Sequence, residues 1–527
     1  MSIKLNHIEL FSGCGGLSLG LESAGFELTF ANELSPMASE TFAYNLLCEN
    51  LDKLSKQGKN SDKVYWISSQ YDDLKERLRE NPFEYPEPDC GVTDIPDIPS
   101  LIKGKLLVGN IIHLNKLLER RPELLEAVKG GFGDNGVDLV SGGPPCQSFS
   151  MAGLRKKDCD KNSLPWEFAK FVGMIQPKFV VLENVSGILR AFKEDGISYH
   201  AWFEVAKVFA GKGYIPLCLH INARLAGIPQ NRPRFIMIGI REDIYHGIST
   251  SFNNEEDLLF SPCIELFNKI KTGKNVDIKN YHCFDATAKK DFDLFNNSFI
   301  SSLVGKKEVS VKEAIHDLRL NNSSRKSNFV SKLNQQFTPI LNRALSKANH
   351  EPRNNSNLVK RRFRIYQVIQ KCSQDASKQI FNILQGKSTD LCDITWDVLK
   401  KHEYLSEQNE YIKFQTKIDL IRYLLQHSTK KRTQRALDAT GPAPAALSIP
   451  DDICHYDVHE LRTLTVREMA RIQSFPDSFV FRSKVTTGGK ARRFEVPQYT
   501  QVGNAVPPLL GLRIGESIIE LLHRVSM

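Results

Sequence analysis

Six short apolar runs in the amino-terminal half constrain the fold of this chain more than any other feature. They alternate with stretches of helical period, which is the pattern of a doubly wound, mostly parallel sheet. Strands buried on both faces of such a sheet read as nearly continuous hydrophobic residues. We therefore predict an α/β domain. The expected strands are His7–Phe11, Leu28–Asn32, Val137–Ser141, Phe179–Glu183, Tyr214–Asn222 and Arg234–Ile240.

Two segments interrupt this pattern. Residues 48–104 are polar and proline-rich toward their end, which indicates a surface insertion. The region after Ile240 is rich in Asn, Lys and Ser, becomes helical in period from about residue 360, and ends at the linker Gly441-Pro442-Ala443-Pro444. A chain of 527 residues exceeds the usual size of one core, so more than one domain is expected. We expect a first domain over 1–242, an inserted domain over 243–440, and a return to the first domain over 441–527.

A stiff turn places one thiol directly after an expected strand. Cys146 follows Gly142-Gly143-Pro144-Pro145, in which prolines fix the backbone and glycines permit close approach. Open α/β sheets bind ligands at the carboxyl ends of their strands, so this thiol is well placed to act as a nucleophile. Taken alone, the turn fits a buried core cysteine somewhat better than a nucleophile.

Polar groups also lie at the ends of two further expected strands. Glu183 ends the run Phe179–Glu183, so its carboxyl group should emerge at the same sheet edge as the thiol. Arg234 begins the run Arg234–Ile240, and Arg232 precedes it by two residues. A thiol, a carboxyl group and guanidinium groups together suit an attack on a flat, electron-poor ring. An ion pair at a strand end and solvated surface arginines are the alternatives.

Glycines 13, 15 and 16 lie between the first expected strand and a helix. Such a loop lets a ligand approach the backbone at a helix start, although a dinucleotide site or tight turn packing would look similar. Glu33 ends the second strand, where a carboxylate can accept both hydroxyls of a ribose. The loop departs from Gly-x-Gly-x-x-Gly, which disfavours a nicotinamide cofactor.

Composition adds weaker constraints. The net charge of +9 fits a polyanionic partner such as nucleic acid. The eleven cysteines include no Cys-x-x-Cys pair, so neither a metal site nor a disulfide framework is expected. The amino terminus lacks a hydrophobic signal core and no long apolar segment occurs, so we expect a protein without membrane association in the cytoplasm.

The chain resembles the DNA (cytosine-5)-methyltransferases of bacterial restriction-modification systems over residues 5–242 and 440–525. The motifs that carry the resemblance stand in the family's order, and six collinear matches are far more specific than any one. They are Phe11-Ser12-Gly13-Cys14-Gly15-Gly16-Leu17, the Pro-Pro-Cys turn, Glu183-Asn184-Val185, Gln230-Asn231-Arg232-Pro233-Arg234, Leu464–Pro476 and Gln501–Pro508.

The resemblance implies a Rossmann-like domain that binds S-adenosylmethionine. Phe11 would lie against the adenosine part, Glu33 would bind the ribose, and Leu34 and Ile111 would flank the adenine. The family usually has aspartate where this chain has Asn110, whose side-chain oxygen can still accept a hydrogen bond from the adenine amine. The remaining expected cofactor residues are Ser12, Gly13, Gly15, Gly16, Leu17, Pro145 and Asn504, the last of which also fits a helix cap.

The resemblance also implies the chemistry. Cytosine is a poor nucleophile at carbon 5, so the Cys146 thiolate would add to carbon 6 and turn the ring into an enamine. Glu183 would supply a proton at ring nitrogen 3, Arg234 would contact the ring carbonyl, and Arg232 would steady Glu183 or the nucleotide. The target base must leave the helix stack for this reaction. The basic segment Ser148–Lys157 is a candidate for the loop that replaces it, or an ordinary surface loop.

The inserted domain would then recognise the target sequence in double-stranded DNA. Its basic clusters, Lys360–Arg364 and Lys430–Arg432, fit a phosphate-binding surface or a solvated helical face. A restriction endonuclease acting on the same site is the expected partner, and the bacterial nucleoid the expected location. An RNA cytosine methyltransferase, a catalytically silent DNA-binding regulator and a nicotinamide-dependent dehydrogenase remain as alternatives.

Overall fold

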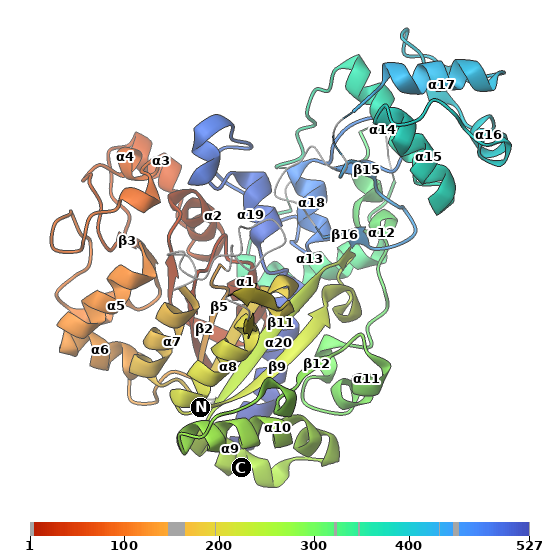
Figure 1. Cartoon of the computed structure of the whole chain (residues 1–527). Helices are drawn as coiled ribbons and strands as arrows, with labels where there is room; N and C mark the ends of the chain where they lie inside the picture. Colours follow the sequence, from red (N-terminus) through yellow and green to blue (C-terminus); the bar gives the residue numbers. More distant parts are fainter. Residues whose placement is uncertain are drawn as a thin grey trace.

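The computed structural model describes residues 5–145, 164–194, 197–320, 324–345, 348–429, 431, 433–445 and 453–525. Its centre is a nine-stranded sheet in the order β12-β9-β11-β6-β5-β1-β2-β4-β3 (Figure 1). Strand β11, which lies between β9 and β6, is antiparallel to both neighbours, and the other pairs are parallel. The strands are β1 (Leu5–Leu10), β2 (Phe26–Glu33), β3 (Val64–Trp66), β4 (Lys105–Val108), β5 (Leu139–Gly142), β6 (Phe179–Val185), β9 (Tyr214–Asn222), β11 (Pro233–Arg241) and β12 (Cys283–Asp285).

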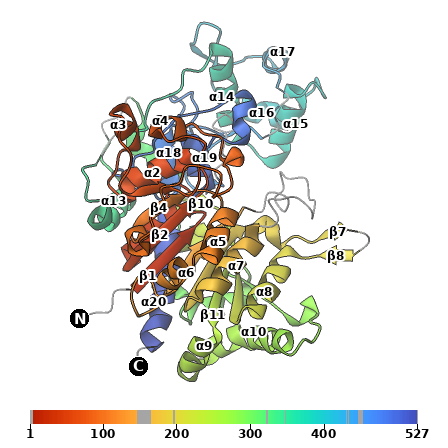
Figure 2. The same cartoon turned by 90° about the vertical axis from the view of Figure 1, so that its left-hand side faces the viewer.

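Helices cover both faces of this sheet, so the prediction of a doubly wound, Rossmann-like domain is confirmed. The six expected runs are β1, β2, β5, β6, β9 and β11. Figures 1 and 2 show α7 and α8 on one face and α20 on the other. The helices of this body are α1 (Gly16–Ala24), α2 (Pro36–Leu46), α3 (Leu51–Lys56), α4 (Leu74–Arg77), α5 (Ile111–Arg120), α6 (Pro122–Lys129), α7 (Leu164–Ile175), α8 (Ala201–Gly211), α9 (Glu242–Ile248), α10 (Asn254–Lys271), α11 (Lys289–Asn296) and α20 (Pro508–Val525), beside the hairpin β7 (Phe192–Glu194) and β8 (Ile197–Tyr199).

The packing differs from the expected division of the chain in two places. The expected surface insertion 48–104 contains β3, which forms one edge of the sheet and buries Trp66 completely. The expected inserted domain begins at 243, yet β12 forms the opposite edge and Phe260 of α10 lies in the main core. The Asn and Lys residues of that segment are mostly exposed, and its apolar residues pack in the main core. Composition alone therefore assigned the segment to the inserted domain.

The rest of the inserted region forms two smaller cores. The first joins the helices α12 (Val311–Ile315), α13 (Asn328–Leu341), α18 (Val466–Ile472) and α19 (Gln498–Asn504), and includes Cys14 and Leu19 beside the glycine loop. The second lies at the far end of the molecule (Figure 1) and is called the helical lobe, residues 356–436. It contains α14 (Asn357–Ile369), α15 (Gln374–Leu384), α16 (Asp393–Leu399), α17 (Lys417–Gln426), the hairpin β13 (Tyr404–Leu405) and β14 (Tyr411–Ile412), and β15 (Arg435–Ala436), which pairs with β17 (Ile453–Cys454).

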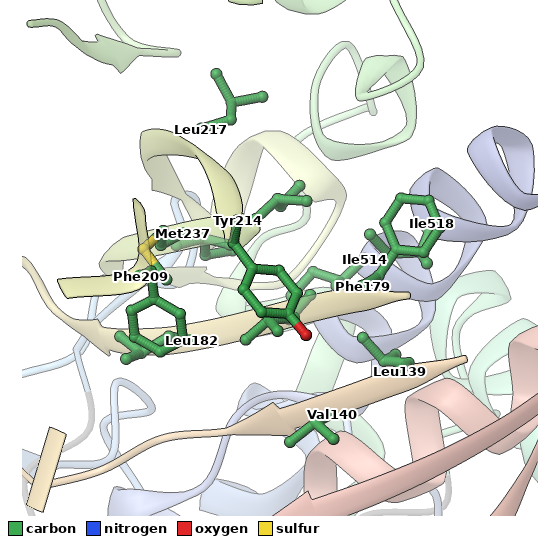
Figure 3. Packing of buried hydrophobic residues seen from close by; sticks show 14 of the residues in the cluster. Leu139, Val140, Phe179, Leu182, Phe209, Tyr214, Leu217, Met237, Ile514 and Ile518 are labelled. Carbon is green, nitrogen blue, oxygen red and sulfur yellow. The ribbon is translucent and has the colours of Figure 1, made fainter. Parts of the chain in front are cut away.

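The last helix of the chain, α20, packs against the first one, α1. Figure 3 shows Ile514 and Ile518 of α20 beside Phe179 of β6, within the buried cluster under the sheet. On its other side α20 lies against α1 at backbone distance. A Cβ atom at Gly20 would stand 2.4 Å from both Leu512 N and Pro508 O, so no other residue fits there without movement of the backbone.

Among the helices of the described residues, none has both the length and the apolar character to cross a bilayer.

Substitution Gly20→Ala tests this contact. Because the added methyl group meets backbone atoms, the free energy of unfolding should fall by about 1–3 kcal/mol, the usual cost of overpacking. The measurement is the midpoint of urea unfolding of the full chain, monitored by circular dichroism. Gly247→Ala in α9 is the matched control, since a Cβ atom there meets open space and alanine favours helix. Equal midpoints for the two variants would contradict the proposed close contact.

Candidate active site

The register of the parallel strands aligns the expected site residues along one edge of the sheet. Leu10 lies opposite both Asn32 and Gly142, and Gly142 lies opposite Leu182. The next residues in these strands are Phe11, Glu33, Gly143 and Glu183, which therefore follow one another along the carboxyl edge. The register therefore places these four residues at one edge of the sheet, and the Cys146 thiol, which was expected to share that edge with Glu183, lies outside the described residues.

Each of the three glycines in the loop has a different structural environment. Gly13 has φ +55°, and a Cβ atom there would meet nothing within 4 Å, so the loop is open beside it. Gly15, the N-cap of α1 with φ +91°, packs against Leu46. Gly16 approaches the returning segment so closely that a Cβ atom would lie 2.3 Å from Val506 O. Of the three glycines, only Gly13 has open space at the position of a side chain.

Glu33 fastens this loop to the next helix. Its Oε2 accepts a hydrogen bond from Gly13 N at 2.8 Å, and its Oε1 accepts one from Ser35 N at 2.8 Å. Burial raises the pKa of this carboxyl group, and these backbone donors oppose the shift. Each carboxylate oxygen has a second lone pair, so the group can still accept hydrogen bonds from a diol.

The other expected cofactor residues lie around the same edge. The Ser12 hydroxyl is buried and has no hydrogen-bond partner among the described residues. Asn110 caps α5, where its Oδ1 accepts from Ile112 N at 3.0 Å. Leu17 and Ile111 are buried in the main core, and Leu34 is half-buried. An unsatisfied hydroxyl beside open space at Gly13 fits a ligand with polar groups.

Glu183 and Arg234 form a buried ion pair on neighbouring strands. Glu183 Oε1 lies 2.6 Å from Arg234 Nε, and both side chains are about nine-tenths buried. Burial lowers the pKa of the Arg234 guanidinium, which the charge of Glu183 partly offsets. A Cβ atom at Gly143 would come within 3.1 Å of Glu183 Oε2, so the carboxyl group sits directly against the start of the proline turn.

Arg232 hydrogen-bonds to the returning segment, and the charge of Glu183, which it was expected to steady, also acts on it. Its Nη2 donates to Gly503 O at 2.9 Å and to Ala505 O at 3.0 Å, so it binds the segment that follows α19. The side chain is buried, and this burial together with the charge of Arg234 places its pKa well below the ordinary value. Arg232 therefore holds the returning segment to the sheet edge, and Asn504 between its two acceptors is exposed.

The turn that leads to the expected nucleophile is tied to β6. Asn184 Nδ2 donates to Pro144 O at 2.9 Å, and Pro145 is exposed. Cys146 and the segment Ser148–Lys157 lie outside the described residues. The described part of the turn thus ends beside the Glu183 and Arg234 pair.

Sequence reasoning missed Gln501, although it lies within a quoted motif. Its Oε1 accepts from Thr41 Oγ1 at 2.6 Å, and its Nε2 donates to Met37 O at 3.1 Å and to Val496 O at 3.0 Å. It therefore joins α19 to α2 at the edge that carries the glycine loop. A glutamine inside a motif of mostly small and apolar residues is the sequence signal that could have revealed it.

The basic cluster of α14 serves mainly to build the helical lobe. Arg361 Nε donates to His427 Nε2 and Arg362 Nε to His427 O, so both fasten the end of α17. Arg364 is buried and donates to Glu403 O at 2.7 Å. The expectation that this cluster forms a phosphate-binding surface is wrong for Arg364. Lys430 and Arg432 lie outside the described residues.

Comparison with known proteins decides the family. The pattern described as "C-5 cytosine-specific DNA methylase" matches residues 5–66 and 125–520. The chain belongs to this family. It is a DNA (cytosine-5) methyltransferase, and the family match does not support the RNA-modifying, silent or nicotinamide-dependent alternatives.

Individual relatives agree over nearly the whole length. Type II methyltransferase M.DdeI of Desulfomicrobium norvegicum is 25% identical over 99% of this chain and 90% of its own length. Type II methyltransferase M1.HphI of Haemophilus parahaemolyticus is 25% identical over 98% of this chain and 88% of its own. A solved structure of a protein assigned as a prophage-encoded DNA modification methyltransferase of E. coli has the same fold, with TM-score 0.52 and 20% identity over 98% of this chain and 99% of its own.

A buried carboxyl group beneath the glycine loop makes the stability of this methyltransferase depend on pH. Glu9 of β1 is buried and accepts a hydrogen bond from Ser18 Oγ of α1. Burial raises the pKa of Glu9 to about 8, although the Ser18 hydrogen bonds oppose the shift. The folded state therefore favours the protonated form of Glu9.

Substitution Glu9→Gln should flatten this dependence. The folded pKa lies above the unfolded value of about 4.3, so the stabilisation is complete at low pH and is lost as the pH rises toward about 8. Glutamine keeps the acceptor for Ser18 and cannot ionise. Thermal unfolding midpoints between about pH 5 and pH 8 should fall less for the variant than for the unchanged protein. If the unfolding midpoints of the two proteins changed equally with pH, a protonated Glu9 in the folded state would be ruled out.

Proposed function

We propose that this methyltransferase uses S-adenosylmethionine to methylate carbon 5 of a flipped cytosine in a specific duplex DNA sequence, with Cys146 as nucleophile and Glu183 as acid. The observation that carries the proposal is the buried pair of Glu183 and Arg234, which lies against the turn leading to Cys146. A carboxyl group, a guanidinium group and a thiol at one strand edge are the groups that such a ring addition requires.

The residues present fit S-adenosylmethionine. The unsatisfied Ser12 hydroxyl, the open space at Gly13 and the accepting carboxylate of Glu33 provide polar contacts at one side of the edge. Phe11, Gly15, Gly16 and Leu17 complete the loop. Leu34, Asn110, Ile111, Pro145 and Asn504 are the remaining candidates. When bound, the sulfonium group of this cofactor supplies an electrophilic methyl group.

The chain's own residues would carry the remaining steps. The Cys146 sulfur forms a bond to carbon 6, and the displaced electron pair reaches ring nitrogen 3. Glu183 provides a proton or a strong hydrogen bond there, while Arg234 orients the Glu183 carboxyl group and contacts the ring carbonyl. After carbon 5 is methylated, its hydrogen leaves as a proton, the bond between sulfur and carbon 6 breaks, and the thiolate is restored.

The region between the two halves of the sheet domain would select the target sequence. The expected range was 243–440, and the packing favours the part after residue 304, including the helical lobe. The relatives named above are type II methyltransferases, which supports a role in restriction-modification beside an endonuclease that cuts the same site. Such a pair would act on the DNA of a bacterial nucleoid.

Substitution Cys146→Ser tests the nucleophile. Methyl transfer to duplex DNA should be lost, because a serine hydroxyl ionises far less than a thiol at neutral pH, while binding of labelled S-adenosylmethionine should remain. Duplex DNA with 5-fluorocytosine at the target should become covalently joined to the unchanged protein and not to the variant. Transfer at the normal rate by the variant, or label that enters RNA and not DNA, would overturn the proposal.

Substitution Glu183→Gln tests the acid. Glutamine preserves the shape but cannot donate a proton, so kcat should fall by about 10²- to 10⁴-fold, the usual contribution of general acid catalysis. Glu49→Gln is a control. Glu49 lies between α2 and α3 and binds Ser61 and the backbone at Asp62, just before β3 at the edge of the sheet, and it is not part of the pair of Glu183 and Arg234. An unchanged kcat for Glu183→Gln, measured with saturating DNA and cofactor, would remove Glu183 from the reaction.

A further inference from the structure

The segment Ser483–Val496 forms a compact basic projection, here called the basic finger. It carries Lys484, Lys490, Arg492 and Arg493, and its one acidic residue is Glu495. Lys490, Arg492 and Arg493 are exposed, and none of the three forms an ion pair within the described part of the chain. Three neighbouring cations without an ion-pair partner among the described residues repel one another, so an anionic ligand would stabilise this arrangement.

Internal contacts hold the finger in shape. At its base, Gln498 N donates to Lys484 O at 2.8 Å and Gln498 Nε2 to Ser483 O at 3.0 Å. Glu495 binds both Lys484 and Thr487, so the acidic residue is used within the base. Arg492 Nε donates to Thr487 O at 3.3 Å, which joins the tip to the base. The cations are therefore presented on an organised turn.

The finger stands close to the candidate active site. Helix α19 begins at Gln498 in the base of the finger and ends at Asn504, beside the carbonyl groups that Arg232 binds. Seven helical residues span about 10 Å, so the base lies about three base pairs of DNA from the site edge. Figure 1 shows this segment on the same side of the sheet as the helical lobe and separated from it along that edge.

One further cation, Arg79, extends this surface. Arg79, which is exposed, lies 3.4 Å from Ser483 Oγ through its Nη1. Gly488 and Gly489 at the tip have no atom near the position of a Cβ, so their backbone is open to close approach. A surface of guanidinium and ammonium groups with open backbone suits phosphate oxygens.

We propose that the basic finger binds the phosphodiester backbone of DNA beside the flipped cytosine, independently of the base sequence. The inference rests on the proposed function, because it presumes that duplex DNA enters along this edge. In this arrangement the helical lobe reads bases on one side of the target, and the finger fixes the backbone on the other. Contacts to phosphate set register and orientation and carry no sequence information.

The test is the salt dependence of DNA binding by the full chain carrying Lys490→Gln, Arg492→Gln and Arg493→Gln together. The probe is a short duplex of A·T pairs, which contains no cytosine and reports sequence-independent contacts. Each lost phosphate contact lowers the slope of log binding constant against log salt by about 0.9, so the triple variant should lose about 2.7. Between 50 and 200 mM salt, the unchanged protein would then weaken about 40-fold more than the variant.

The matched control carries Lys274→Gln, Lys289→Gln and Lys290→Gln, which remove the same charge from exposed positions on α11 and after α10. Its slope should stay unchanged. A second variant, Lys490→Gln with Arg493→Gln, keeps the Arg492 contact and should lose about 1.8. An unchanged slope in the finger variants, or an equal loss in the control, would overturn the inference. Methyl transfer by the unchanged protein, measured separately, shows whether the proposed function itself stands.

Discussion

Helix α20 approaches α1 so closely that Gly20 and Gly511 leave no space for side chains between the two backbones. This contact joins the beginning of the chain to its end across an interruption of several hundred residues. It also brings Val506 O against Gly16 at the start of α1, so the glycine loop takes its shape partly from the returning segment. The surroundings of the candidate cofactor site are therefore built from both ends of the chain.

The same docking explains why two arginines are buried near each other at the sheet edge. Arg232 binds two backbone carbonyl groups of the returning segment, and Arg234 pairs with Glu183. Burial of a guanidinium group is costly unless its hydrogen bonds and charge are satisfied. Arg232 donates to two carbonyl groups, so the direct ion pair of Glu183 is with Arg234, although the charge of Glu183 also acts on Arg232.

The sheet and the residues along its edge could be predicted because parallel strands carry a strong and local signal. Runs such as Phe179–Glu183 are apolar on both faces, and the register then places Phe11, Glu33 and Glu183 together. The partners of Arg232 and Arg361 could not be predicted, since they depend on segments distant in sequence. The strand β12 was missed for a similar reason, because three residues are too short to show a period.

The two basic regions show how charge in a sequence differs from charge on a surface. The cluster on α14 is denser in arginine, yet Arg361, Arg362 and Arg364 use their donors on carbonyl groups and a histidine within the helical lobe. The basic finger keeps Lys490 and Arg493 exposed because its acidic residue is engaged at the base. Counterion release requires cations that are free to meet phosphate. The finger meets that requirement, and the α14 cluster meets it only in part.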